Sequence, residues 1–140
     1  MYSSILVPID LDESSSWSKA VPAALSLAKC FGARCTLATV VQDSVAAREA
    51  QWSPIAFREL LATAGARLSV LAGDLSSDAR VETKVGTGSI CGGILDLAEQ
   101  VEADLIVLAS HRPAMKDWLI GANDARVVRH SRCSVLVVRD

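Results

Sequence analysis

Four short segments of the chain are apolar on both faces, and they restrict its fold more than any other feature. They are Ser4–Ile9, Cys35–Val41, Asp104–Ala109 and Ser134–Val138. A strand with one face in water alternates polar and apolar residues, so strands that are apolar at nearly every position must be covered on both sides. Such strands are typical of a parallel sheet between two layers of helices. Ala79–Val85 alternates instead, and we expect it at an edge of the sheet.

Between these segments the apolar residues recur every three or four positions, as they do on one face of an amphipathic helix. Three such stripes are Trp17, Ala20, Val21, Ala24 and Ala28; Phe57, Leu60, Leu61, Ala64, Leu68 and Leu71; and Ile90, Ile94, Leu95, Ala98 and Val101. Ser53–Pro54 and Ser89 or Gly88 have the chemistry of helix starts, and Gly32 and Gly73 that of residues just past helix ends. The pattern therefore predicts a helix between successive strands.

This alternation of strands and helices predicts the α/β class. Parallel strands joined by helices form right-handed crossovers, and the expected architecture is an open, doubly wound parallel sheet. We expect a single domain over residues 1–140, because 51% of the residues are hydrophobic and a chain of this length can bury one core.

Charge, hydropathy and cysteine content exclude several functions. A net charge of −2, with Lys and Arg spread along the chain, provides no footprint for nucleic acid or an anionic membrane. No apolar run approaches the roughly 18–20 residues that span a bilayer, and the N-terminus lacks a basic leader, so we expect a cytoplasmic protein.

The four cysteines form no CxxC pair and have no matching His pair at metal-ligand spacing. They are Cys30, Cys35, Cys91 and Cys133. We therefore expect neither a metal site nor a disulfide.

Polar residues follow two of the apolar segments. The first segment ends with Pro8 and Ile9 and is followed by Asp10. The third of the four ends with Ala109 and is followed by Ser110, His111 and Arg112. In a doubly wound sheet, ligands bind beyond the carboxyl ends of the strands, where the winding direction reverses. A helix that we expect to start at Gly121 would present free N–H groups and a positive dipole end there, which suits a phosphate. We predict an anion site in the crevice between these two strands.

The C-terminal third of the chain carries a recognisable set of residues. It contains Ser110-His111-Arg112-Pro113, Gly121-Ala122-Asn123, Val127-Val128-Arg129-His130 and the strand from Cys133 to Val138. With ILVPID near the start, Thr39-Val40-Val41 and ADLIVLAS, these residues resemble the universal stress protein family over essentially the whole chain. The resemblance implies a Rossmann-like fold of the adenine nucleotide alpha hydrolase type, with five parallel strands in the order 3-2-1-4-5. It also implies a homodimer joined through the last strand, Ser134–Val138.

In the ATP-binding branch of that family, an Asp after the first strand and a Val at the end of the second strand hold the adenosine. The corresponding residues here are Asp10 and Val40, and Pro8 lines the same wall. The resemblance implies ATP as the ligand, accompanied by Mg²⁺, and a role in stress-response signalling. It implies at most slow ATP hydrolysis or autophosphorylation, since the sequence shows no Walker lysine, metal set or activated nucleophile.

The phosphate motif of that branch is Gly, two residues, Gly, nine residues, Gly and then Ser or Thr, and this chain departs from it. Ala109 and Arg112 stand at the first two glycines, eight residues separate Arg112 from Gly121, and Ala122 replaces the hydroxyl residue. These changes favour the alternative of a nucleotide-free universal stress protein that acts through protein–protein interaction. However, a Ser-His-Arg-Pro loop with this spacing to Gly-X-Asn resembles a subgroup that includes nucleotide binders. In that interpretation Arg112 contacts phosphate, beside the N–H groups of Ala122 and Asn123 at the helix start.

The candidate ligand-binding residues are therefore Pro8, Asp10, Val40, Ala109, Ser110, His111, Arg112, Gly121, Ala122 and Asn123. Some of the polar features also have a second interpretation. Asp10 fits a turn or a helix N-cap as well as a ligand contact. His111 fits a general base, yet the sequence places no nucleophile beside it, and the alternative is that it orders the turn or contacts phosphate. Gly86–Ser89 follows a strand and opens a helix, as a dinucleotide-binding loop does, but close packing and turn geometry also explain its glycines.

Overall fold

The computed structural model describes residues 1–42, 54–75, 81–110 and 118–139, with the backbone alone for residues 118–122. The described residues form one sheet whose strands pair in parallel in the order β3-β2-β1-β4-β5. The strands are β1 (Ser4–Pro8), β2 (Arg34–Gln42), β3 (Val81–Gly88), β4 (Leu105–Ser110) and β5 (Ser134–Arg139). This confirms the predicted fold class, the strand order and the position of β3 at an edge.

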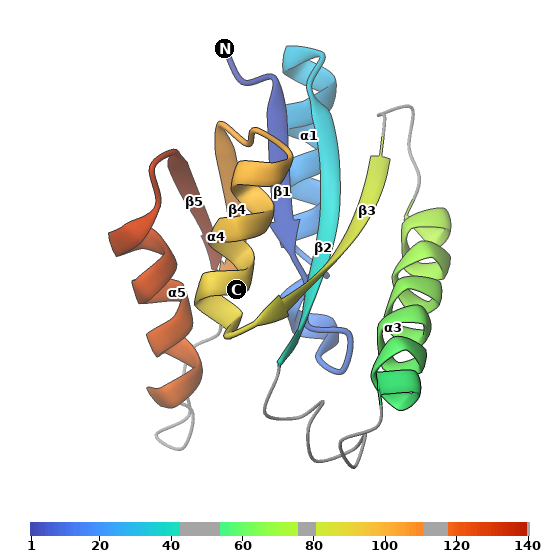
Figure 1. The fold of residues 1–140 in the computed structure, drawn as a ribbon. Helices are drawn as coiled ribbons and strands as arrows, with labels where there is room; N and C mark the ends of the chain where they lie inside the picture. The colour runs from blue at the N-terminus through green and yellow to red at the C-terminus, as the bar shows by residue number, and fades with distance from the viewer. Residues whose placement is uncertain (43–53, 76–80, 111–117, 140) are drawn as a thin grey trace.

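Helices cover both faces of the sheet (Figure 1). They are the short 3-10 helix η1 (Ser14–Ser16) and the α-helices α1 (Ala20–Phe31), α3 (Pro54–Asp74), α4 (Ile90–Gln100) and α5 (Trp118–His130). One apolar cluster contains residues of α1 and α3 with alternate residues of the central strands, and a second contains residues of α4 and α5 with the intervening ones. Each central strand is thus buried on both faces, as its composition indicates. None of the described helices is long and apolar enough to cross a membrane.

The helix boundaries follow the sequence signals at several points and depart from them at two. Helix α3 begins at Pro54, the Ser89 hydroxyl caps α4 by accepting the Gly92 N–H at 3.1 Å, and Gly32 ends α1 with φ 66°. The prediction for Gly73 is wrong, because α3 continues to Asp74. Helix α5 begins at Trp118, so the predicted start at Gly121 is also wrong. Ser53 lies outside the described residues.

Close packing explains the glycines around the β3–α4 junction. A Cβ on Gly86 would lie 2.8 Å from Leu97 Cδ1, and one on Gly93 would lie 2.7 Å from Val40 Cγ1 and 3.0 Å from the Thr87 carbonyl oxygen. Gly88 adopts φ +98°, which side-chain-bearing residues rarely do. These contacts favour the packing interpretation of Gly86–Ser89, and they let α4 lie close against β2 and β3.

Strands β1 and β4 are paired only near their amino ends. Their ladder joins Ile5 to Leu105 and Leu6 to Ile106 and continues no further. By contrast, β1 stays paired with β2 as far as Pro8, and β4 stays paired with β5 to its last residue. The two central strands therefore separate at their carboxyl ends, which is where the winding direction of the sheet reverses.

Pro8 lies where β1 and β4 separate, and its backbone faces β4. The Ser4 carbonyl accepts the Asp104 N–H at 2.9 Å on the β4 side, whereas the Ile9 N–H donates to the Ala38 carbonyl at 2.7 Å on the β2 side. Alternate residues of a strand direct their backbone polar groups to the same neighbour, so Pro8, like Ser4, faces β4. Since proline has no N–H, β1 leaves no unpaired donor there.

Asp104 fastens the opposite, amino end of the same two strands. Its Oδ2 accepts the Ser3 N–H at 2.8 Å and the Ser3 hydroxyl at 3.0 Å, and its Oδ1 accepts the Ser4 N–H at 3.1 Å. Burial alone would raise the pKa of this carboxyl, but these hydrogen bonds outweigh burial and lower the pKa below its usual value.

We expect Gly93→Ala to destabilise the protein, because the added methyl meets the stiff side chain of Val40 and a backbone carbonyl. Overpacking of this kind costs about 1–3 kcal/mol. Gly65→Ala in α3 is the matched control, since its Cβ would lie 3.8 Å from Val85 Cγ2, an ordinary contact. The control should stabilise the helix by about 0.5–1 kcal/mol. Urea unfolding measures the free energy of unfolding of both variants. Equal changes in that free energy would contradict the close-packing explanation of Gly93.

We expect Asp104→Asn to lower the free energy of unfolding at pH 7 by about 1 kcal/mol, by weakening the hydrogen bonds from Ser3 and Ser4. The folded-state pKa of Asp104 is lowered, so its stabilisation is complete above the unfolded pKa of about 3.9 and is lost as pH falls through the folded pKa. The difference from wild type should therefore shrink below about pH 4. Asp96→Asn, on the exposed side of α4, is the control. A difference that does not change with pH would refute the assignment.

Candidate functional site

A cavity of about 760 Å³ lies at the carboxyl ends of the strands. Its floor comes from the ends of β1, β2 and β4, where β1 and β4 separate, and its walls come from α3, α4 and α5. Its size is typical of small-molecule sites, and the position agrees with the site predicted from the sequence.

The structure brings half of the predicted site residues together around this cavity. Pro8, Asp10, Val40, Ala109 and Asn123 all line it. They come from β1 and its following loop, from β2, from β4 and from α5, so only the folded sheet makes them neighbours.

The other predicted residues are less fully defined. Ser110 is the last residue of β4, directly after the lining residue Ala109. Gly121 and Ala122 belong to α5, of which the structure describes only the backbone at these positions. His111 and Arg112 lie outside the described residues.

Asp10 is held in a turn that also keeps it at the cavity. Its Oδ1 accepts the Asp12 N–H at 3.0 Å, and the Ser16 hydroxyl donates to the Asp10 carbonyl at 3.0 Å and accepts the Asp10 N–H at 2.9 Å. The turn interpretation of Asp10 is therefore confirmed, and it coexists with a place in the cavity lining. The turn occupies Oδ1, and Oδ2 takes no part in it.

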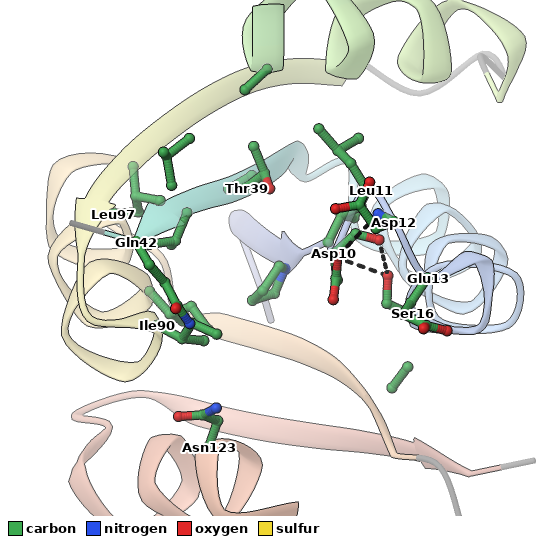
Figure 2. A pocket seen from close by; sticks show the side chains of 18 of the residues that line it. Asp10, Leu11, Asp12, Glu13, Ser16, Thr39, Gln42, Ile90, Leu97 and Asn123 are labelled. Carbon is green, nitrogen blue, oxygen red and sulfur yellow. Dashed lines mark hydrogen bonds between the residues drawn. The ribbon is translucent and has the colours of Figure 1, made fainter. Parts of the chain in front are cut away.

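Apolar side chains form the opposite side of the cavity. Val40 lies against α4 at the point where Gly93 permits close approach, and Ile90, Ile94 and Leu97 of α4 continue the wall. Figure 2 shows Ile90 and Gln42 on this side, and Asp10, Asp12 and Glu13 together on the other. The cavity thus offers an apolar surface facing hydrogen-bond acceptors, which suits a flat, polar-edged ring such as a nucleobase.

The observed start of α5 changes the expected source of backbone donors. Ala122 and Asn123 are the fifth and sixth residues of a helix that begins at Trp118. The first four N–H groups of a helix have no partner within the helix, so the N–H groups of Ala122 and Asn123 are not among them. Asn123 reaches the cavity through its side chain instead (Figure 2).

Helix α3 also contributes to the cavity, and none of its residues is among the candidates from the sequence. Leu60, Thr63, Ala64 and Arg67 form one wall, and the Arg67 Nη2 donates to the Leu11 carbonyl at 3.2 Å and to Asp12 Oδ1 at 3.1 Å. Arg67 follows Leu60 by seven residues, so it continues the apolar stripe of that helix. A cation on an otherwise apolar stripe was the available signal.

The charges of the cavity are unevenly distributed. Asp10, Asp12 and Glu13 lie together on the β1 side, where Arg67 provides a cation. No group of three or more metal-ligating side chains is arranged to hold a metal ion in the part of the chain that the structure describes. The carboxylates make the β1 side a place for hydrogen-bond donors rather than for anions.

Comparison with known proteins agrees with the geometry. The chain matches the universal stress protein family over residues 1–139. Universal stress protein G of Salmonella typhimurium is 32% identical over 143 residues, which cover 99% of this chain and 100% of that protein.

Two solved structures illustrate the similarity of the fold. Universal stress protein UspA from Lactobacillus plantarum has a TM-score of 0.75 at 27% identity, covering 99% of this chain and 98% of that one. A universal stress protein in complex with cAMP has a TM-score of 0.66 at 25% identity, covering 99% and 97%. The family match and the shared strand order together show that this chain belongs to the universal stress protein family.

Proposed function

We propose that this protein is a homodimeric, cytoplasmic module that binds an adenine nucleotide, ATP, and acts in stress-response signalling. One observation carries the nucleotide proposal. The cavity lies where β1 and β4 separate, and it gathers Pro8, Asp10, Val40, Ala109 and Asn123 from four different elements. Open α/β sheets bind their ligands at this place. A cytoplasmic setting is consistent with the free thiols of all four cysteines, which a reducing compartment preserves.

The adenosine is proposed to lie between Asp10 and Val40. The Val40 side presents apolar surface to the face of the base, and Pro8 continues that surface toward β1. The Asp10 carboxylate can accept hydrogen bonds from the amino or hydroxyl groups of an adenosine through Oδ2, since the turn uses Oδ1. The carboxylates beside Asp10 repel phosphate, which orients the nucleotide with its phosphates away from β1.

The phosphates are then proposed to lie between the end of β4 and the first turn of α5. Ser110 ends β4, His111 and Arg112 follow it in the chain, and Gly121, Ala122 and Asn123 lie in α5. The Arg112 guanidinium suits bidentate contact with phosphate oxygens, and the dipole of α5 favours negative charge at its N-terminal end. Mg²⁺ would accompany the phosphates and offset part of their charge. Arg112 and the Ser-His-Arg-Pro loop thus take the role of the missing glycines.

The relative in complex with cAMP supports the adenine class of ligand. That protein is 25% identical to this chain and superposes over 99% of it. cAMP and ATP share adenosine and differ in their phosphates, so a common adenosine site with different phosphate contacts accommodates either ligand.

The dimer is proposed to form through β5. Among the described residues, this strand pairs with β4 on one side only, and an edge strand of this kind presents unpaired backbone donors and acceptors. Leu136 of β5 is 38% exposed and Val128 of the neighbouring α5 is 50% exposed. Pairing with the same edge of a second copy would satisfy the backbone groups and cover these side chains.

A nucleotide-free protein that acts through protein partners is the alternative function. The substitutions at Ala109, Arg112 and Ala122, which depart from the glycine motif, favour it. Nucleotide carried through purification, identified by chromatography of the heat-released fraction, would decide against it.

We expect calorimetric titration to give micromolar binding of ATP with Mg²⁺ and much weaker binding of GTP. Asp10→Asn should weaken ATP binding by about tenfold, the size of one hydrogen bond to a charged group. Asp96→Asn makes the same charge change on the exposed side of α4 and should bind as the wild type does. No heat from nucleotide-free wild-type protein would refute the proposed ligand.

We expect the wild type to sediment as a dimer at micromolar concentration and Leu136→Glu to sediment as a monomer, because the new carboxylate would be buried without a partner. Val70→Glu introduces the same charge at a position of α3 that is 66% exposed and should remain dimeric. A monomeric wild type, or a dimeric Leu136→Glu protein, would contradict the proposed interface.

A further inference from the structure

We propose that Arg67 of α3 is a positioning residue for nucleotide binding. It holds the turn formed by residues 10–12 in the shape that presents Asp10 to the ligand. This inference rests on the proposed function of the cavity. It assigns a role to a residue that is 55 positions from Asp12 in the sequence and that belongs to a different wall of the cavity.

Two successive links connect Arg67 to Asp10. One guanidinium nitrogen, Nη2, donates to the Leu11 carbonyl at 3.2 Å and to Asp12 Oδ1 at 3.1 Å. Asp12 in turn donates its N–H to Asp10 Oδ1 at 3.0 Å. Arg67 therefore holds both the backbone and the side chain of the turn, and the turn fixes the rotation of the Asp10 carboxylate.

Apart from the packing of Leu11 against the core, the remaining contacts of residues 10–13 are local hydrogen bonds. The Ser16 hydroxyl and the Glu13 N–H bond the Asp10 carbonyl, and the Asp10 N–H bonds Ser16. These bonds shape the turn, but they do not fix where it lies relative to the rest of the cavity. Among the described residues, Arg67 supplies both long-range hydrogen bonds of residues 10–13.

The side chains of Arg67 and Asp12 are too exposed for their ion pair to stabilise the whole protein appreciably. The side chain of Arg67 is 50% exposed and that of Asp12 is 83% exposed. Ion pairs this exposed contribute little to the free energy of unfolding, because water screens them. The consequence of losing Arg67 should therefore be confined to the turn and to the ligand that Asp10 binds.

The first test uses ligand-free protein and compares Arg67→Met with Arg58→Met. Methionine keeps an apolar stem of similar length but removes the donors. Arg58 is exposed on the same helix and does not line the cavity. We expect amide hydrogen exchange at Asp12 to be about fivefold faster in Arg67→Met, unchanged in Arg58→Met and partly restored in Arg67→Lys. The melting temperature should be nearly the same in all variants.

The second test is a double-mutant cycle on ATP affinity, measured by calorimetry. Arg67→Met alone should weaken binding by up to about fivefold, the most that the loss of one exposed ion pair costs. In an Asp10→Asn background it should weaken binding by less than about twofold, because the carboxylate through which Arg67 acts is gone. Fully multiplicative effects would show that Arg67 acts independently of Asp10 and would overturn the proposal.

The outcomes also separate this inference from the proposed function. If the wild type binds no nucleotide, the proposed ligand is wrong, and the exchange rate at Asp12 still decides whether Arg67 holds the turn. If the wild type binds ATP but Arg67→Met retains both wild-type affinity and slow exchange, the positioning role is wrong and the nucleotide site stands.

Discussion

The rest of the structure depends on the separation of β1 from β4. Ladder hydrogen bonds hold the two strands at Ile5 and Leu6, and Asp104 fastens the same end. Beyond Leu6 the strands follow different neighbours, β1 with β2 and β4 with β5. Pro8, which has no N–H, stands at the position where β1 would otherwise present an unpaired donor to the gap. A crevice between β1 and β4 is therefore built into the sheet, while each strand stays paired with its other neighbour.

Residues of α3, α4 and α5 wall the crevice and make it a cavity with two different sides. The glycine at position 93 lets α4 contact Val40 closely and makes one side apolar. On the other side, α3 reaches the loop after β1 through Arg67 and joins a cluster of carboxylates. The result is an asymmetric site, with surface for a ring on one side and acceptors for its polar edge on the other. This asymmetry gives the proposed nucleotide a single orientation.

The strands and the parallel sheet could be predicted, and five of the ten candidate site residues line the cavity, because their signals are local. A strand buried on both faces is apolar throughout, and Pro8, Asp10 and Ala109 stand directly at strand ends. The cation on the apolar stripe of α3 marks Arg67 as unusual, but its partners could not be predicted, because only tertiary packing brings Arg67 to Leu11 and Asp12. Glycine is a poor guide to helix ends in this chain, because α5 contains Gly121 as its fourth residue. Gly73 likewise lies inside α3, one residue before its end.

The most direct test of the proposed nucleotide site is a titration of ¹⁵N-labelled protein with ATP and Mg²⁺, followed by amide chemical shifts. If the crevice between β1 and β4 is the nucleotide site, the largest shifts will fall on Asp10, Val40, Ala109 and Asn123, which line it from the loop after β1, β2, β4 and α5. Ser4 and Asp104, at the opposite end of the same strands, will remain nearly unchanged. Shifts concentrated at the amino end of the sheet or on the β5 edge, or no shifts at saturating ATP, would contradict the account.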